Sequence, residues 1–122
     1  MSLPQDDLGA FTRELLAFRD ARDWAQFHSL RNLMVSLQLE AGELLELSQW
    51  LDDAALEARL ATPAGREALE DECADVFMYL LLIAERSGVD LLAAARAKLA
   101  KNAAKYPVEA FRGSHRKYNA QE

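Results

Sequence analysis

Two pairs of acidic residues lie inside the most apolar parts of this chain. Glu40 and Glu43 belong to the stretch LEAGELLELSQW, and Glu72 and Asp75 belong to LEDECADVFMYLLLIAE. The two acids of each pair are three residues apart, so on a helix both side chains lie on one face. Like charges at that spacing repel each other and slightly destabilise a helix. The chain must therefore either expose both pairs to water or bring them together around a counter-charge.

The rest of the sequence predicts an all-α fold. Ala and Leu make up about a third of the 122 residues, against one Ile, four Val and two Thr, which favours helices over strands. The apolar spacing predicts a four-helix bundle, with helices at about residues 5–21, 30–51, 63–87 and 90–105. Residues 52–61 are expected to form a short helix at best. The chain is interpreted as a single domain over 1–122, with a core at about 5–106 and an irregular basic tail at 107–122.

Capping residues mark where these helices begin and end. Ser29 is expected to cap the second helix, and Thr62 followed by Pro63 is a start signal for the third. Gly88 is expected to end the third helix, and Asp90 to cap the fourth.

Composition excludes several classes of partner. The net charge of −6 argues against binding a nucleic-acid polymer, and no run of about twenty apolar residues predicts a membrane span. The first residues are acidic and lack the apolar core of a secretion signal. Cys73 is the single cysteine, and we expect it to be a small buried apolar residue. These features predict a cytoplasmic protein.

The four acids predict a metal site if the two helices face each other. Four carboxylates in one bundle cannot all stay ionised without a counter-charge, and hard divalent cations with oxygen ligands supply one. The Glu-x-x-His pattern of di-iron bundles is absent, so Mg²⁺, or Mn²⁺ in its place, is favoured over iron. The alternative is that each pair forms a solvated acidic stripe.

Aromatic and polar residues near the acids are candidates for binding a flat ligand. Trp50 and Tyr79 are expected on the helix faces that carry the acids, where they could stack on a base or simply pack in the core. His28 lies near Trp24 in the connection 22–29, where it could contact a ligand or remain at the surface. Asn32 could donate a hydrogen bond to a base edge, although a role in helix capping explains it equally well.

The motifs that hold these residues resemble a known family. E-x-x-E on one predicted helix and E-x-x-D on the next resemble the MazG-like all-α nucleoside triphosphate pyrophosphatases. The stretches ARDWAQFHSLRNLMVSLQLEAGELLELSQW, KLAKNAAKYP and HRKY are similar to the branch of that family that acts on dCTP. The resemblance extends to Tyr118, nearly the whole chain.

The resemblance implies roles for individual residues. It implies that the metal is bound by Glu40, Glu43, Glu72 and Asp75, and that Trp24 and His28 belong to a loop that closes on the nucleotide. It implies that Trp50 and Tyr79 line the base and sugar pocket. Contacts around the sugar and phosphates are implied for Lys98, Asn102, Lys105 and Tyr106. It also implies a homotetramer, built as a pair of dimers with sites formed between subunits. Leu15 stands where the animal enzymes have histidine, so one contact to the base is expected to be missing.

Residues and resemblance together predict a Mg²⁺-dependent enzyme that hydrolyses a deoxynucleoside triphosphate, dCTP or a modified dCTP, to the monophosphate and pyrophosphate. The metal would polarise the phosphates and lower the pKa of a bound water. Glu46, one step beyond Glu43, could orient or deprotonate that water, or make a structural hydrogen bond. The alternatives are a MazG-like pyrophosphatase of other or broad base preference, and a non-catalytic helical binding module.

Overall fold

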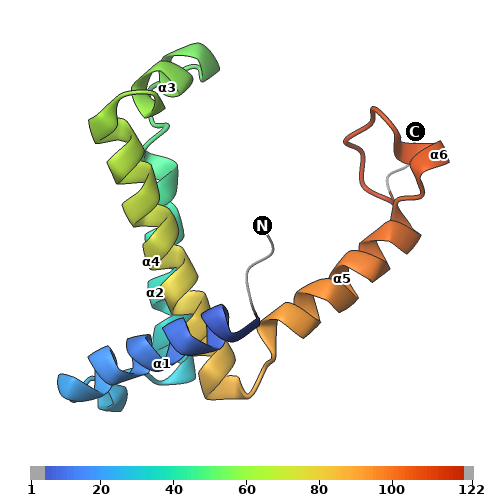
Figure 1. The fold of residues 1–122 in the computed structure, drawn as a ribbon. Coiled ribbons are helices and arrows are strands. Elements are labelled where there is room, and N and C mark those ends of the chain that lie inside the picture. The colour runs from blue at the N-terminus through green and yellow to red at the C-terminus, as the bar shows by residue number, and fades with distance from the viewer. Residues whose placement is uncertain (1–4, 120–122) are drawn as a thin grey trace. The chain divides into compact units, whose positions relative to one another are not determined.

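The computed structural model describes residues 5–119, with side chains from residue 7 onwards, and this part of the chain contains helices and no strand (Figure 1). The helices are α1 (Gln5–Ala21), the 3₁₀ turn η1 (Ala25–Phe27), α2 (Leu30–Glu46), α3 (Asp53–Leu60), α4 (Pro63–Ser87), α5 (Leu91–Lys105) and α6 (Val108–Phe111). The predicted all-α class is therefore confirmed. No helix in the described range is long and apolar enough to cross a bilayer.

The helices begin and end at the residues that cap them. The Asn32 backbone N–H donates to Ser29 Oγ at 3.1 Å at the start of α2, and the Gly65 N–H donates to Thr62 Oγ1 at 3.1 Å at the start of α4. Gly88 ends α4 with φ 70°, a left-handed conformation that costs glycine little, and Asp90 caps α5. These boundaries agree with those predicted.

The predicted end of α2 was wrong. The helix stops at Glu46, five residues before the expected Leu51, and continues as turns to Trp50. The Ser48 hydroxyl donates to the Leu45 carbonyl at 2.7 Å, which competes with the helical ladder. Trp50 has φ 69°, an unfavourable backbone conformation for a bulky residue, so the chain turns sharply before α3.

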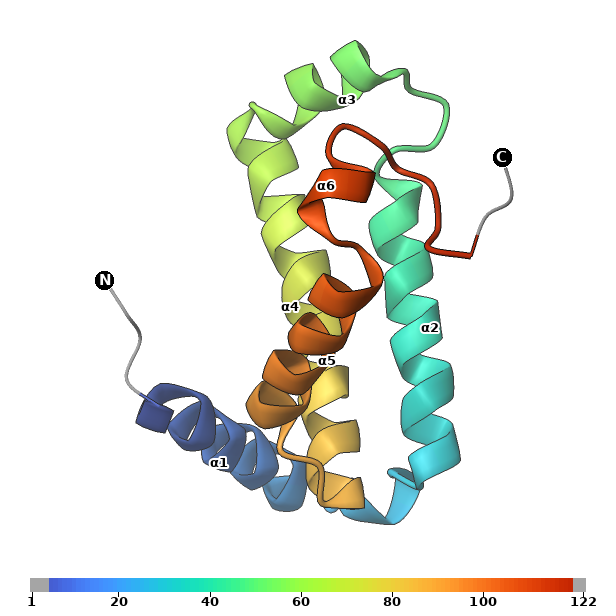
Figure 2. The same ribbon diagram turned by 90° about the vertical axis from the view of Figure 1, so that its right-hand side faces the viewer.

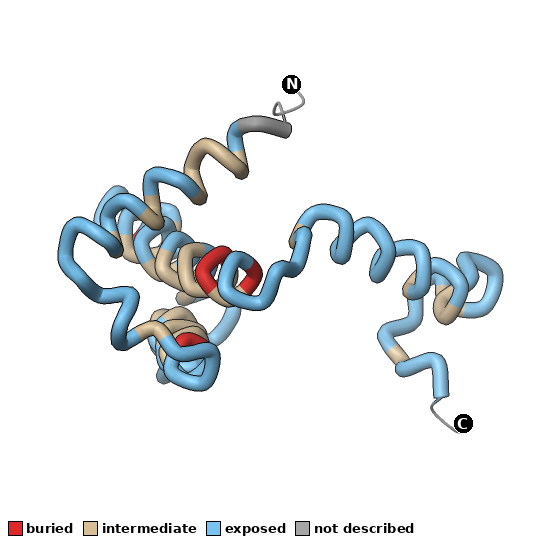
Figure 3. Tube along the Cα trace, turned by 90° about the horizontal axis from the view of Figure 1, so that it is seen from below, coloured by how far each residue is buried: buried red, intermediate tan, exposed pale blue. Residues whose placement is uncertain are grey.

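The chain divides into two compact units, the first extending to Gly88 and the second beginning at Val89. In the first unit α2 and α4 run antiparallel and pack along each other, while α1 and α3 also contact α4 (Figure 2). The buried apolar residues are Leu33 on α2 and Leu81, Leu82 and Ala84 on α4, shown red in Figure 3. This small core holds the two acid-bearing helices side by side.

Cys73 does not belong to this core. We expected a buried cysteine, but its side chain is exposed. It is rotated by about 100° around α4 from its neighbour Glu72. In the described chain that part of the helix surface is not covered.

The second unit consists of α5, α6 and the residues that follow. The Tyr106 ring lies edge-on to Phe111 and Tyr118, with centroids 4.9 and 6.0 Å away, and Lys105 Nζ lies 4.8 Å from the centre of the Tyr118 ring. The tail was expected to be irregular. The structure forms the single-turn helix α6 directly after Pro107, and residues 112–119 are irregular, as expected.

Candidate active site

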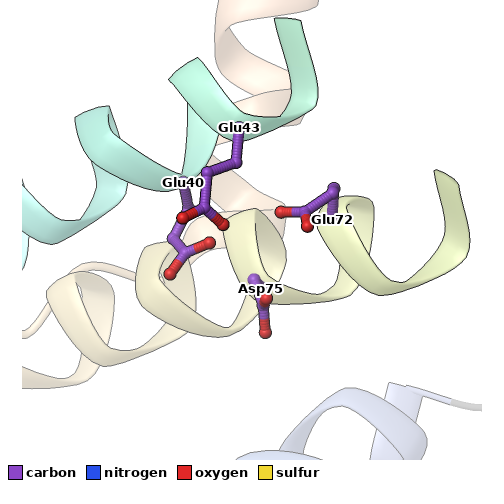
Figure 4. A group of neighbouring side chains, drawn as sticks. All are labelled: Glu40, Glu43, Glu72 and Asp75. Atoms are coloured by element: carbon purple, nitrogen blue, oxygen red, sulfur yellow. The ribbon is translucent and has the colours of Figure 1, made fainter. Parts of the chain in front are cut away.

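Four carboxylates meet where α2 and α4 face each other. Glu40 and Glu43 come from α2, and Glu72 and Asp75 come from α4 (Figure 4). One carboxylate oxygen from each of these residues lies within 4.8 Å of those of the other three. The acids of each pair are neighbours because they are three residues apart on one helix, and the two pairs meet because the helices pack together along their length.

Crowding of these acids disfavours their ionised forms. The pKa of Glu40 is raised to about 7, first by burial and then by the neighbouring carboxylates of Glu43, Asp75 and Glu72. The pKa of Glu72 is also raised, again by burial first and by the negative charge of Glu43 next. The protein thus holds a concentrated negative charge that its own described side chains do not neutralise.

Two atoms of the cluster are suited to accept a cation. Glu40 Oε2 and Glu72 Oε2 are buried and have no hydrogen-bond partner in the described chain. A buried acceptor without a partner is costly, and a ligand that bonds to it removes the cost. Four oxygen donors of net negative charge match the preference of hard divalent cations such as Mg²⁺ and Mn²⁺. The residues present fit a divalent metal.

A hollow of about 430 Å³ adjoins the acids. Glu40 and Asp75 of the acid cluster line one end of it. The remainder of its wall is mainly apolar, made by Phe11, Leu15, Phe18, Trp24, Met78 and Leu82, with Glu14, Arg19, His28 and Tyr79 as polar members. Leu82 is seven residues beyond Asp75, so the hollow extends about 10 Å along α4. It has room and apolar surface for a flat organic group next to the four acids.

His28 lies away from the acids along this hollow and shares a second, smaller hollow of about 300 Å³ with Arg19, Ala25, Glu85 and Arg86. Burial, and then the positive charge of Arg19, lower the pKa of His28. Both effects favour the neutral imidazole. Nδ1 is buried and has no partner among the described residues, so it is available to a ligand.

The structure brings some of the predicted binding residues to this hollow. Trp24, His28 and Tyr79 all line it. Asn32 does not: its Nδ2 donates to the Phe27 carbonyl at 3.1 Å and so holds the turn before α2. Trp50 also lies outside the hollow: it follows the C-terminal end of α2, whereas the hollow extends from Glu40 toward His28 at the start of that helix. Its side chain is 92% exposed.

Glu46 is the last residue of α2, is exposed, and is not part of the four-acid cluster. Lys98, Asn102, Lys105 and Tyr106 lie on or just after α5 in the second unit. Lys105 and Tyr106 pack there against the rings of the tail. The roles assigned to these residues from the sequence stay predictions.

Sequence reasoning missed several residues of the hollow, among them Arg19, Phe18 and Met78. The position of Arg19 in the sequence could have predicted that it belongs to the hollow. It lies four residues after Leu15 and eight after Phe11, and so continues the apolar face of α1 with a cation. A charged residue on the buried face of a helix indicates a partner or a ligand.

Fold and site together define an all-helical protein with four clustered carboxylates, suited to a divalent cation, beside an apolar hollow. The sequence model of a family described as MazG-like matches residues 35–120. Proteins named dCTP pyrophosphatase 1 from Rattus norvegicus and Homo sapiens are 43% and 41% identical over 115 residues, covering 94% of this chain and 68% of theirs. A pyrophosphatase structure from Archaeoglobus fulgidus superposes with a TM-score of 0.77 at 32% identity, covering 88% of this chain and 98% of that one. This chain belongs to the MazG-like family, as the resemblance of its motifs implied.

Proposed function

We propose that this protein hydrolyses dCTP to dCMP and pyrophosphate with a Mg²⁺ ion held by Glu40, Glu43, Glu72 and Asp75. The observation that carries the proposal is the meeting of these four acids at one end of an apolar hollow. The names of the relatives support the same enzyme class and the same base. Mn²⁺ is the expected substitute, since it accepts the same oxygen donors. A nucleotide substrate fits a cytoplasmic location.

Different parts of the hollow are proposed to bind different parts of the nucleotide. A divalent cation in the cluster would polarise the phosphate oxygens and provide an activated water for attack on phosphorus. The four acids would hold that cation and so would position the triphosphate, which a protein of net charge −6 otherwise repels. The apolar wall binds the base and sugar and excludes water from them, with Tyr79 one turn beyond Asp75 toward the sugar and Trp24 and His28 farther along.

Residues outside the hollow are proposed to act on the attacking water, the sugar and the phosphates. Glu46, one turn beyond Glu43 on α2, is proposed to orient or deprotonate the attacking water. Lys98, Asn102, Lys105 and Tyr106 are proposed to contact the sugar and phosphates. Asn32 is proposed to act on the ligand indirectly, since its amide is engaged by Phe27.

The protein is proposed to be a homotetramer, a dimer of dimers. Large apolar side chains are exposed along α2 in the single chain, including Met34, Val35, Leu39 and Leu45, and an apolar face of this kind is typical of a surface that a partner covers. Trp50 is an exposed tryptophan in a strained conformation. We propose that it walls the nucleotide site of a neighbouring copy.

The test of the function is pyrophosphate release from the four common deoxynucleoside triphosphates and CTP, with Mg²⁺ and with a chelator. Glu43→Gln and Asp75→Asn keep side-chain shape and remove one charge each, so turnover should fall by about a hundredfold or more while the fold remains. Glu67→Gln is the matched control, because Glu67 is an exposed acid of α4 outside the cluster. Wild-type turnover by either cluster variant at saturating Mg²⁺ would contradict the metal assignment. Metal binding without any turnover would instead indicate a binding module.

A further inference from the structure

Arg19 is the one lysine or arginine among the residues that line the apolar hollow. It lies near the end of α1, and its side chain is 18% exposed. Nε donates a hydrogen bond to Asp20 Oδ1 at 2.8 Å, and Nη1 lies 3.7 Å from Glu85 Oε2. Asp20 and Glu85 come from two different helices, so the guanidinium is held in place by α1 and α4 together.

The contact with Glu85 places Arg19 at the end of the hollow that is far from the four acids. Glu85 is ten residues beyond Asp75 on α4, which corresponds to about 15 Å along the helix axis. A nucleotide whose phosphates are held at the acids spans a comparable length before its base ends. Arg19 is therefore too distant to contact the phosphates together with the acids, and it lies where the base would end.

The guanidinium keeps hydrogen-bond donors for a ligand. Arginine has five N–H donors in a planar fork. In the described chain, Arg19 uses one of them in a hydrogen bond, from Nε to Asp20, and the 3.7 Å approach to Glu85 is an ion pair longer than a hydrogen bond. The neighbouring wall residues Leu15 and Phe18 offer no polar group. A base edge that reaches this end therefore meets Arg19, the unpartnered Nδ1 of His28 and the indole of Trp24, which packs on Phe18 and has a single N–H donor.

We propose that Arg19 is a specificity-determining residue, whose guanidinium donates to the O2 and N3 atoms of cytosine. This inference rests on the proposed function, since it assumes a nucleotide with its phosphates at the acids. Cytosine presents O2 and N3 as two adjacent acceptors, which suit the parallel donors of a guanidinium. Thymine has an N–H at position 3, so the same fork would meet a donor there. The arrangement selects cytosine, because with thymine the guanidinium N–H and the N–H at position 3 would face each other and neither could accept a hydrogen bond.

The test compares kcat/KM for dCTP and dTTP in the wild-type protein and in Arg19→Met. Methionine keeps the apolar stem and removes every donor. We expect kcat/KM for dCTP to fall by about tenfold or more, mostly through KM, while the value for dTTP changes little, as for a lost bidentate contact to a base. Arg19→Lys keeps the charge but not the fork, so it should also lower the dCTP to dTTP ratio while retaining more activity overall. The Kd of Mg²⁺ should be unchanged in both variants.

Arg86→Met is the matched control, because Arg86 lines the smaller hollow but not the apolar one. It should leave the ratio unchanged. A purely structural role for Arg19, tying α1 to α4, would lower thermal stability and both kcat/KM values together. An unchanged ratio in folded Arg19→Met, or in Arg19→Lys if the methionine variant does not fold, would overturn the inference and leave the proposed function standing. Absence of metal-dependent turnover of every nucleotide by the wild type would overturn the proposed function itself.

Discussion

At the scale of single residues, the four acids are arranged for a ligand rather than for the stability of the metal-free chain. Glu40 and Glu72 each bury an oxygen without a hydrogen bond, and their pKa values are raised. Each ionisation brings another negative charge into a group whose oxygens lie within 4.8 Å of one another. A bound cation would reverse this repulsion, so metal binding should stabilise the fold.

This repulsion predicts a pH dependence of stability. Glu40 releases its proton near pH 4.5 when unfolded and near pH 7 when folded. Between these values the unfolded chain binds fewer protons, so the free energy of unfolding contributed by Glu40 falls as pH rises. With a chelator present, Glu40→Gln should therefore raise the melting temperature more at pH 8 than at pH 5. Added Mg²⁺ should stabilise the wild type most at pH 8, where the acids are ionised.

The measurement is thermal unfolding followed by circular dichroism at the two pH values. His28 has a lowered pKa and contributes with the opposite sign as it titrates, so only the difference between wild type and variant reports on Glu40. Glu67→Gln serves as control and should show no such difference. An equal effect of Glu40→Gln at both pH values would mean that Glu40 ionises freely in the folded protein.

At the scale of helices, the sequence predicted most boundaries because they depend on nearby residues. Ser29, Thr62, Gly88 and Asp90 cap helices through contacts within four residues, and such contacts are visible in a sequence. The end of α2 was missed because leucines continue the helical period while the Ser48 hydroxyl and the turn at Trp50 end it. The acids were found for the same reason as the caps, since their spacing of three puts each pair on one face.

The far end of the hollow could not be predicted in the same way. It depends on how α1 crosses α4, which brings Arg19 of one helix to Glu85 of the other. Residues 66 positions apart in the sequence meet there, and no local pattern records their pairing. The place of Trp50 depends on the packing direction in the same way: α2 and α4 run antiparallel, so the end of α2 that leads to Trp50 lies away from His28 and Leu82, and Trp50 does not line the hollow of its own chain.

The corner between α3 and α4 depends on Gly65. This glycine is buried, and a Cβ there would overlap the Arg59 carbonyl at the end of α3. Gly65→Ala should therefore push α3 away from α4 and destabilise the protein by about 1–3 kcal/mol, the usual cost of overpacking. Gly9→Ala is the control, since its Cβ would meet only Arg13 Nη1 at 3.5 Å and alanine favours the helix. Urea unfolding measures both, and a Gly65→Ala variant as stable as wild type would show that the corner opens freely.

At the scale of the whole molecule, the single chain has more apolar surface than its small core can cover. Four apolar residues are buried in the described chain, whereas Trp50, Leu45 and Leu39 are 92%, 72% and 65% exposed. An assembly of copies would cover such side chains. Light scattering at micromolar concentration should therefore give a mass near four times the 13.7 kDa of one chain. A monomer at that concentration would contradict the proposed tetramer.

The assembly also predicts how defective chains complement each other. Trp50→Ala should weaken dCTP binding by about 1–3 kcal/mol, as for other base–aromatic stacks, and Glu43→Gln should remove turnover. If Trp50 of one copy walls the hollow of another, equal amounts of the two variants refolded together should form about a quarter of their sites with both residues intact. Activity at low dCTP should then exceed the mean of the separate variants.

The matched mixture is Glu43→Gln with Asp75→Asn. Both residues belong to the acid cluster of a single chain, so no site in that mixture recovers a complete cluster and activity should stay low. The contrast between the two mixtures separates a shared site from simple stabilisation of one variant by the other. If the Trp50→Ala mixture shows only the mean of its components, Trp50 acts within its own chain or not on the nucleotide at all.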